Sequence, residues 1–219
     1  MTRLDIMSDP ICPWCYIGKA NLDRAIAESG ENPFAIEWRI FQLDPQMAPE
    51  GVDRRTHLEA KFGGAEKLRE IHARIEEAAS EAGLAINFDR IERTPNTMDA
   101  HRLIRWARAT GQQSAMVDRL FADYFVEGRD ISDHEVLVEA ASSIGMEADV
   151  VARLLSGDAD REELRQEEAE ARKMGVNAVP CFILGGRYVI QGAQPVATWR
   201  KLIDELISAR DQQAGVGRH

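Results

Sequence analysis

The feature that most constrains this chain is a pair of cysteines two residues apart, Cys12 and Cys15, which directly follow a short strand pattern. Residues 3–8 alternate in the way a partly amphipathic strand does. Proline is favoured in the first turn of a helix, so Pro13 predicts a helix that begins at about residues 12–13. A second strand is predicted at 34–40. Together these elements form a strand–helix–strand unit with a right-handed crossover.

Two cysteines at the start of a helix predict thiol–disulfide chemistry. The thiolate is the species that attacks a disulfide. The unpaired N–H groups and the positive end of the helix dipole stabilise it at Cys12. Cys15 lies one turn further on, where it can resolve a mixed disulfide. Pro13 sets the first turn without donating an N–H, and Trp14 adds apolar surface that a substrate could contact.

A structural zinc site is the alternative interpretation of this spacing. Such a site needs four ligands, and one Cys-X-X-Cys segment supplies two. The remaining ligands would have to be Cys181 and a histidine: His57, His72, His101 or His134. None of them has zinc-finger spacing, so we expect no bound metal. A zinc-stabilised chaperone or binding module stays open as an alternative.

The rest of the chain predicts an α/β fold interrupted by helices. From about 57 to 174 the apolar spacing is helical. Strand patterns return at 181–184 and 188–190 around a glycine-containing turn, and a last helix follows Pro195. We predict a discontinuous α/β domain of residues 1–50 plus 175–211, a helical insertion domain of residues 51–174, and a flexible tail of residues 212–219.

A second motif, Val179-Pro180-Cys181, stands at the start of the returning strand. An X–Pro bond is cis often enough for a tight turn here, although a proline could also begin an edge strand. From these residues alone both interpretations stay open. Cys181 is expected to be a small buried apolar residue. The alternative is a third thiol near Cys12 that forms another disulfide.

The two motifs, in this order around a helical insertion, resemble the DsbA-like branch of the thioredoxin superfamily. Segments 8–19 (SDPICPWCYIGK), 96–103 (NTMDAHRL) and 192–195 (GAQP) resemble the FrnE-like subgroup. That subgroup is related to 2-hydroxychromene-2-carboxylate isomerase and to kappa-class glutathione transferases. The resemblance implies a thioredoxin-like α/β fold with a large all-helical insertion, and the activity of a protein-disulfide oxidoreductase.

The resemblance also assigns site residues. In that superfamily a cis-proline lies beside the cysteine pair, and the residue before it pairs its backbone with an extended substrate. Pro180 and Val179 are therefore implied to take these places. Asn96 suits a helix N-cap, and the resemblance places that helix start near the site. His101 could tune the thiolate or shuttle a proton. A structural role is the alternative for both.

The expected substrates are proteins or small molecules that carry thiols or disulfides. No organic cofactor is expected. Glutathione is implied as a co-substrate by the kappa-class relatives, and a homodimer is implied by the relatives alone. The alternative activity is a glutathione-dependent isomerase or transferase. Those relatives generally carry serine where Cys12 stands, so two cysteines favour dithiol chemistry.

Charge and hydropathy exclude other classes of partner. The chain has 37 acidic and 27 basic residues, a formal net charge of −10, which argues against a nucleic-acid surface. No apolar run reaches the roughly 18 residues that a membrane span requires. The first ten residues have no apolar signal-peptide segment, so we expect a cytoplasmic protein.

Overall fold

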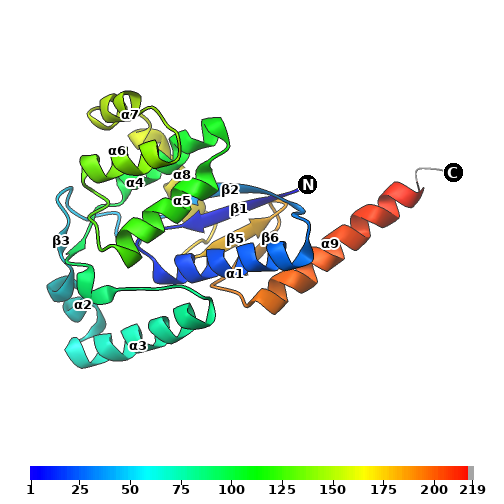
Figure 1. Ribbon diagram of the computed structural model, residues 1–219, viewed down its shortest axis with the longest axis horizontal. Coiled ribbons are helices and arrows are strands. Elements are labelled where there is room, and N and C mark those ends of the chain that lie inside the picture. Colours follow the sequence, from blue (N-terminus) through cyan, green and yellow to red (C-terminus); the bar gives the residue numbers. More distant parts are fainter. Residues whose placement is uncertain (217–219) are drawn as a thin grey trace.

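The computed structural model describes residues 1–216, with side chains described through residue 212, as a sheet flanked by helices (Figure 1). The four-stranded sheet has the order β2-β1-β5-β6. Its strands are β1 (Thr2–Ser8), β2 (Phe34–Ile40), β5 (Cys181–Leu184) and β6 (Tyr188–Gln191). β1 pairs in parallel with β2, whereas β1–β5 and β5–β6 are antiparallel. The first strand of the chain therefore lies between its early neighbour and a strand from the other end of the sequence.

Helices pack against this sheet. α1 (Pro13–Ser29) and α9 (Val196–Val216) lie side by side along the sheet in Figure 1. α8 (Arg161–Lys173) contacts β2. α1 begins where proline predicts and ends at Gly30, whose left-handed backbone (φ 72°) is one that glycine adopts without strain.

The segment between β2 and β5 is mostly helical. Besides α8, it contains α2 (Arg54–Phe62), α3 (Ala65–Glu81), α4 (Met98–Ala107), α5 (Gln113–Phe121), α6 (His134–Ser143) and α7 (Ala148–Leu155), with 3₁₀ turns at Phe88–Arg90 and Arg108–Thr110 and a π-helical turn at Ala122–Val126. A pair of two-residue antiparallel strands, β3 (Val52–Asp53) and β4 (Arg93–Thr94), was not predicted. Strands this short are too brief to produce an alternating pattern.

One hydrophobic core joins the sheet, α1 and the insertion. It contains Leu4 of β1, Leu22 of α1 and Leu120 of α5, each fully buried. The ring of Tyr16 in α1 lies 5.1 Å from that of Phe121 and 5.5 Å from that of Phe125, measured between centroids. The helix that carries the cysteines is thus held between the sheet and the insertion.

The strand and helix predictions are confirmed at 34–40, at 181–184 and after Pro195. The division into an α/β domain (1–50 plus 175–211) and an insertion (51–174) stays a prediction. The tail predicted at 212–219 overlaps the end of α9 as far as Val216, and residues 217–219 lie outside the described residues. Within the described part of the chain, no helix combines the length and the apolar character needed to cross a membrane.

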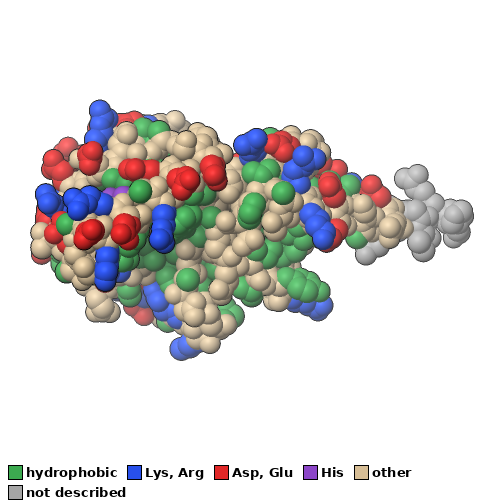
Figure 2. Space-filling model, turned by 90° about the horizontal axis from the view of Figure 1, so that it is seen from below, with side chains coloured by type: hydrophobic (Ala, Val, Ile, Leu, Met, Phe, Trp, Pro, Cys, Tyr) green, Lys and Arg blue, Asp and Glu red, His purple; other side chains and the backbone are tan. Residues whose placement is uncertain are grey.

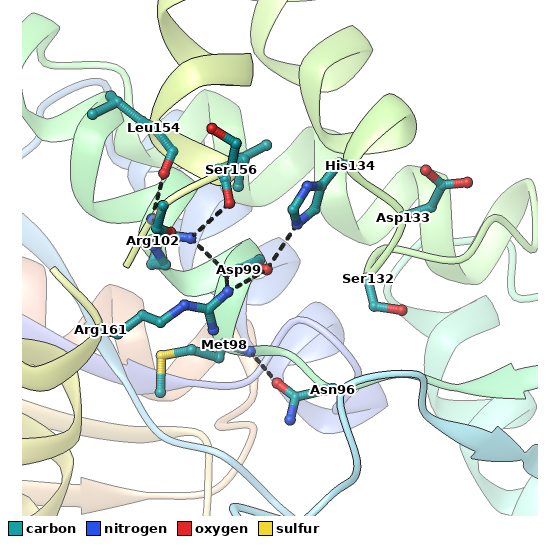
Figure 3. Close-up of polar contacts among 12 residues, drawn as sticks. Asn96, Met98, Asp99, Arg102, Ser132, Asp133, His134, Leu154, Ser156 and Arg161 are labelled. Carbon is teal, nitrogen blue, oxygen red and sulfur yellow. Dashed lines mark hydrogen bonds and ion pairs between the residues drawn. The ribbon is translucent and has the colours of Figure 1, made fainter. Parts of the chain in front are cut away.

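Arg102 of α4 is a fully buried guanidinium that connects α4 to the end of α7 and the loop after it (Figure 3). It donates to Asp99 Oδ1 at 2.8 Å. It also donates to four main-chain carbonyls, those of Leu154 (2.5 Å), Gly157 (2.7 Å), Ala159 (2.7 Å) and Leu155 (3.5 Å). A buried charge is tolerated where it is paired and its hydrogen bonds are made, as here.

Replacing Arg102 with methionine keeps an apolar stem but leaves these acceptors without a donor. We expect Arg102→Met to lower the free energy of unfolding by about 3 kcal/mol in urea titrations. Arg165→Met, at an exposed position of α8, is the matched control and should change it by less than about 0.5 kcal/mol. Equal unfolding midpoints for the two variants would contradict this account.

Candidate active site

The turn between β1 and α1 places both cysteines at the start of the helix. Cys12 is the N-cap residue and Pro13 is the first helical residue. The carbonyl of Cys12 accepts the backbone N–H of Cys15 at 3.0 Å and that of Tyr16 at 3.3 Å. No acidic side chain lies in the first turn of α1, so none in that turn opposes a thiolate.

The two cysteines are buried, whereas Trp14 between them is 40% exposed. Burial raises the pKa of the Cys15 thiol well above its ordinary value, and the contact with Cys12 raises it further. The Ser8 hydroxyl and the backbone of Asp9 lower that pKa in part. Cys15 is therefore a protonated thiol in the reduced protein, which suits a resolving cysteine.

The second motif lies against the first. Cys12 Sγ is 3.7 Å from the carbonyl oxygen of Val179, a residue 167 positions away in the sequence. The Val179–Pro180 peptide bond is cis. Gly18 permits the close approach, because a Cβ at that position would lie 3.1 Å from Cγ of Pro180. The structure thus brings Cys12, Cys15, Val179 and Pro180 into one place.

Cys181 belongs to a different cluster. It is completely buried beside Met7 of β1 and Ala171 of α8. Its neighbours in sequence, Pro180 and Phe182, instead approach Gly18 of α1. Because side chains alternate along a strand, the side chain of Cys181 points to the face of the sheet opposite α1. Burial raises the pKa of its thiol. A redox role for this third cysteine stays a prediction.

Asn96 uses its side chain within the protein. Its Nδ2 donates to the carbonyl of Met47 at 2.6 Å. Its Oδ1 accepts the backbone N–H of Met98 at 2.9 Å (Figure 3). The residue thereby holds the start of α4 against the loop that contains Met47. It also lines a cavity of about 580 Å³ together with side chains of α8. Its predicted role in substrate binding stays a prediction.

His101 and Asp9 form a buried polar contact behind the turn. His101 Nε2 lies 3.9 Å from Asp9 Oδ1. Burial lowers the pKa of His101 to about 3 and raises that of Asp9 to about 7. Sequence reasoning did not single out Asp9, since an aspartate before a proline is typical of a solvated turn. Its place inside the 8–19 segment was the available signal.

The surface of the protein carries several large exposed apolar side chains, and one of them, Trp14, lies between the two cysteines in the chain. Trp14, Leu43 and Phe62 are large hydrophobic residues that remain more than one-third exposed. On the face seen from below, hydrophobic side chains gather in a hollow between α3 and α9 (Figure 2). Such a surface suits a partner that presents apolar groups.

Comparisons with known proteins find relatives that match most of this chain. A family model described as a DSBA-like thioredoxin domain matches residues 3–204. The crystal structure of a probable DsbA oxidoreductase from Streptomyces coelicolor is similar, with 32% sequence identity and a TM-score of 0.85, covering 95% of this chain and 91% of that chain. A curated relative, the uncharacterized protein YwbO of Bacillus subtilis, is 27% identical over 207 residues, which is 93% of this chain and 96% of the relative.

A third match shows the shared fold. The cytosolic disulfide reductase DsbM from Pseudomonas aeruginosa, solved with GSH, is 22% identical with a TM-score of 0.66, covering 94% of this chain and 99% of that chain. The family match and the structure that is 32% identical confirm the thioredoxin-like fold with a helical insertion. The sequence predicted this fold from its strand and helix patterns and from the resemblance carried by its motifs.

The contact between Gly18 and Pro180 can be tested by adding volume. Gly18→Val should lower the free energy of unfolding by about 2 kcal/mol because overpacking forces α1 away from Pro180. Valine forms helices better than glycine, so helix propensity does not explain such a loss. The control Ala20→Val, at a half-buried position of the same helix, should cost less than about 1 kcal/mol. Thermal unfolding of both variants checks this, and an unchanged melting temperature for Gly18→Val would refute it.

Proposed function

The chain belongs to the DSBA-like thioredoxin domain family, and from that premise we propose that it is a cytoplasmic thiol–disulfide oxidoreductase whose redox pair is Cys12 and Cys15. The observation that carries the proposal is the position of Cys12 Sγ, at the start of α1 and 3.7 Å from the carbonyl of Val179. The sulfur therefore faces both the helix terminus and a backbone that a substrate could pair with.

The reaction proceeds through a mixed disulfide. The Cys12 thiolate attacks one sulfur of a substrate disulfide, a bond forms between them, and the other substrate sulfur leaves as a thiolate. Cys15 then loses its proton and attacks Cys12 Sγ. This step releases the second substrate thiol and leaves the Cys12–Cys15 disulfide. Two electrons pass to the substrate, and the same steps in reverse oxidise a dithiol substrate.

The neighbouring residues position this exchange. Pro13 begins the helix whose N-terminal N–H groups face Cys12. The backbone of Val179 offers an extended peptide a place to add as a strand, with Pro180 holding that segment beside the sulfur. The exposed ring of Trp14 would contact apolar groups of the substrate.

The substrates are proteins or small molecules that carry thiols or disulfides, and thiol exchange itself needs no cofactor. We propose glutathione as the partner that restores the starting redox state. The similar DsbM structure, described as a cytosolic disulfide reductase with GSH, supports both the glutathione and the cytoplasmic location. A homodimer stays a prediction.

The two alternative functions, a glutathione-dependent enzyme and a zinc-stabilised module, require different features of the site. A glutathione-dependent isomerase or transferase would use Cys12 and give no role to Cys15, which is buried in contact with it. A zinc-stabilised module needs a set of ligands. Among the residues with described side chains, no group of three or more His, Cys, Asp or Glu is arranged to hold a metal ion.

An equilibrium titration in glutathione redox buffers tests the proposal, with alkylation and mass mapping as the readout. We expect one reversible two-electron transition between the reduced pair and the Cys12–Cys15 disulfide. Cys181→Ser is the control and should leave the midpoint unchanged, because Cys181 lies in a separate cluster. In Cys15→Ser, Cys12 should form only a glutathione adduct.

Other outcomes favour the alternatives. Glutathione adducts at Cys12 in the unaltered protein, with no Cys12–Cys15 disulfide, would support the glutathione-dependent isomerase or transferase. Zinc in the purified protein, with unfolding on addition of a chelator, would support the zinc-stabilised module.

A further inference from the structure

A cavity of about 580 Å³ lies between α8, the loop that follows β2 and the start of α4. Sites for small molecules in proteins usually have volumes of about 300–1,000 Å³, so this cavity is large enough to hold one. Neither Cys12 nor Val179 is among the described residues that line it. The cavity is therefore separate from the contact between Cys12 Sγ and the carbonyl of Val179.

Three guanidinium groups on α8 line the cavity, those of Arg161, Arg165 and Arg172. Residues four or seven positions apart lie on the same side of an α-helix, which explains why all three side chains meet one space. At a rise of 1.5 Å per residue, Arg165 and Arg172 are about 10 Å apart along the helix axis. Positive charge is thus spread along the length of this wall.

Asp99 of α4, one of two carboxylates in the lining, already has three partners (Figure 3). It accepts hydrogen bonds from Arg102 at 2.8 Å and from Arg161 Nη2 at 2.9 Å. Nε2 of His134 lies 3.0 Å from it. The charge of Asp99 is compensated by these donors, and Nη1 of Arg161 makes no hydrogen bond with the described residues.

Glu168 of α8 is the other carboxylate in the lining, and it is buried. It accepts from Arg172 Nη2 at 2.6 Å and from the backbone N–H of Gln42 at 2.8 Å. A buried charge of this kind is compensated by its partners. Nη1 of Arg172 has no hydrogen bond with the described residues, so this guanidinium still has a donor to offer.

Arg165 is the guanidinium of the three that has no close partner. Its contact with the carboxylate of Glu162 is 3.7 Å long, and both side chains are more than half exposed. Exposed pairs of this kind contribute little. Three guanidinium groups against two compensated carboxylates give the cavity an excess of positive charge, in a chain whose formal net charge is −10. A local excess of positive charge attracts anions.

The other lining residues are uncharged, and most of them are apolar: Pro45, Met47, Ala48, Pro49, Met98 and Ala169. Ala169 lies on α8 between Arg165 and Arg172 in the chain. The cavity therefore combines separated guanidinium groups with apolar surface. This combination fits a ligand that is charged at its ends and apolar in its middle.

We propose that this cavity binds an elongated organic anion, with a carboxylate or phosphate group at each end and an apolar chain or ring between them. Guanidinium groups recognise both kinds of oxyanion through paired hydrogen bonds. One end would meet Arg161 and Arg165, the other end Arg172, and the middle would lie on Ala169. This binding does not use Cys12, so the inference goes beyond the proposed function and does not depend on it.

Isothermal titration calorimetry with octanedioate tests the inference, because this dicarboxylate is close in length to the separation of Arg165 and Arg172. We expect it to bind at a single site. Octanoate, which has one acidic group, should bind more weakly, and octanediol, which has none, should not bind. Butanediol bisphosphate has a similar length and shows whether phosphate or carboxylate is preferred. Binding of either dianion supports the inference.

Two variants locate the site. Arg165→Gln removes a guanidinium that has no close partner within the protein, and should weaken the binding of octanedioate about tenfold. Ala169→Glu adds a carboxylate to the lining and should abolish binding. Arg153→Gln and Ala152→Glu are the matched controls, because they make the same changes at exposed positions of α7. Both controls, and Cys12→Ser, should bind octanedioate as the unaltered protein does.

Three results would overturn the inference. The first is that neither dianion binds. The second is that octanediol or octanoate binds as tightly as octanedioate, which would leave no role for two charged ends. The third is that Arg165→Gln and Ala169→Glu bind octanedioate as tightly as their controls. None of these results affects the proposed function, which depends on a reversible disulfide between Cys12 and Cys15.

Discussion

The antiparallel pairing of β1 with β5 is the constraint on which the site depends. The register sets Met7 opposite Cys181, so the turn after β1 and the segment before β5 leave the sheet at the same edge. Cys12 follows the first of these strands and Val179 precedes the second, and their contact at 3.7 Å is the result. Two motifs at opposite ends of the chain become one site through a few strand hydrogen bonds.

The helical insertion completes this site. Tyr16 of α1 packs on Phe121 and Phe125, which fixes the helix that carries the cysteines. α4 contributes His101 behind the turn, where it faces Asp9. Burial then acts in the same direction on both sides of the turn, because it disfavours ionisation of Cys15 and of Asp9. The insertion thus helps to bury both the redox pair and the carboxyl group of Asp9.

The sequence predicts those parts of the fold that depend on local patterns. The strand at 34–40 and the start of α1 follow from periodicity and from Pro13, and both are confirmed. β3 and β4 depend on a distant pairing and leave no pattern. The burial of Asp9 could not be predicted from the sequence either, because it results from packing against α4 and the loop after β2. Predicting the sheet face to which Cys181 points requires the strand register, and no local sequence pattern supplies that register.

The most direct test of the central claim is to trap the mixed disulfide. Cys15→Ser protein would be incubated with a disulfide-linked peptide and mapped by mass spectrometry without reduction. Cys12 is the attacking sulfur and Cys15 the group that releases it in this account, so one peptide should remain attached, at Cys12. An adduct at Cys181, or no adduct at Cys12 while the unaltered protein exchanges with the same peptide, would contradict the assignment.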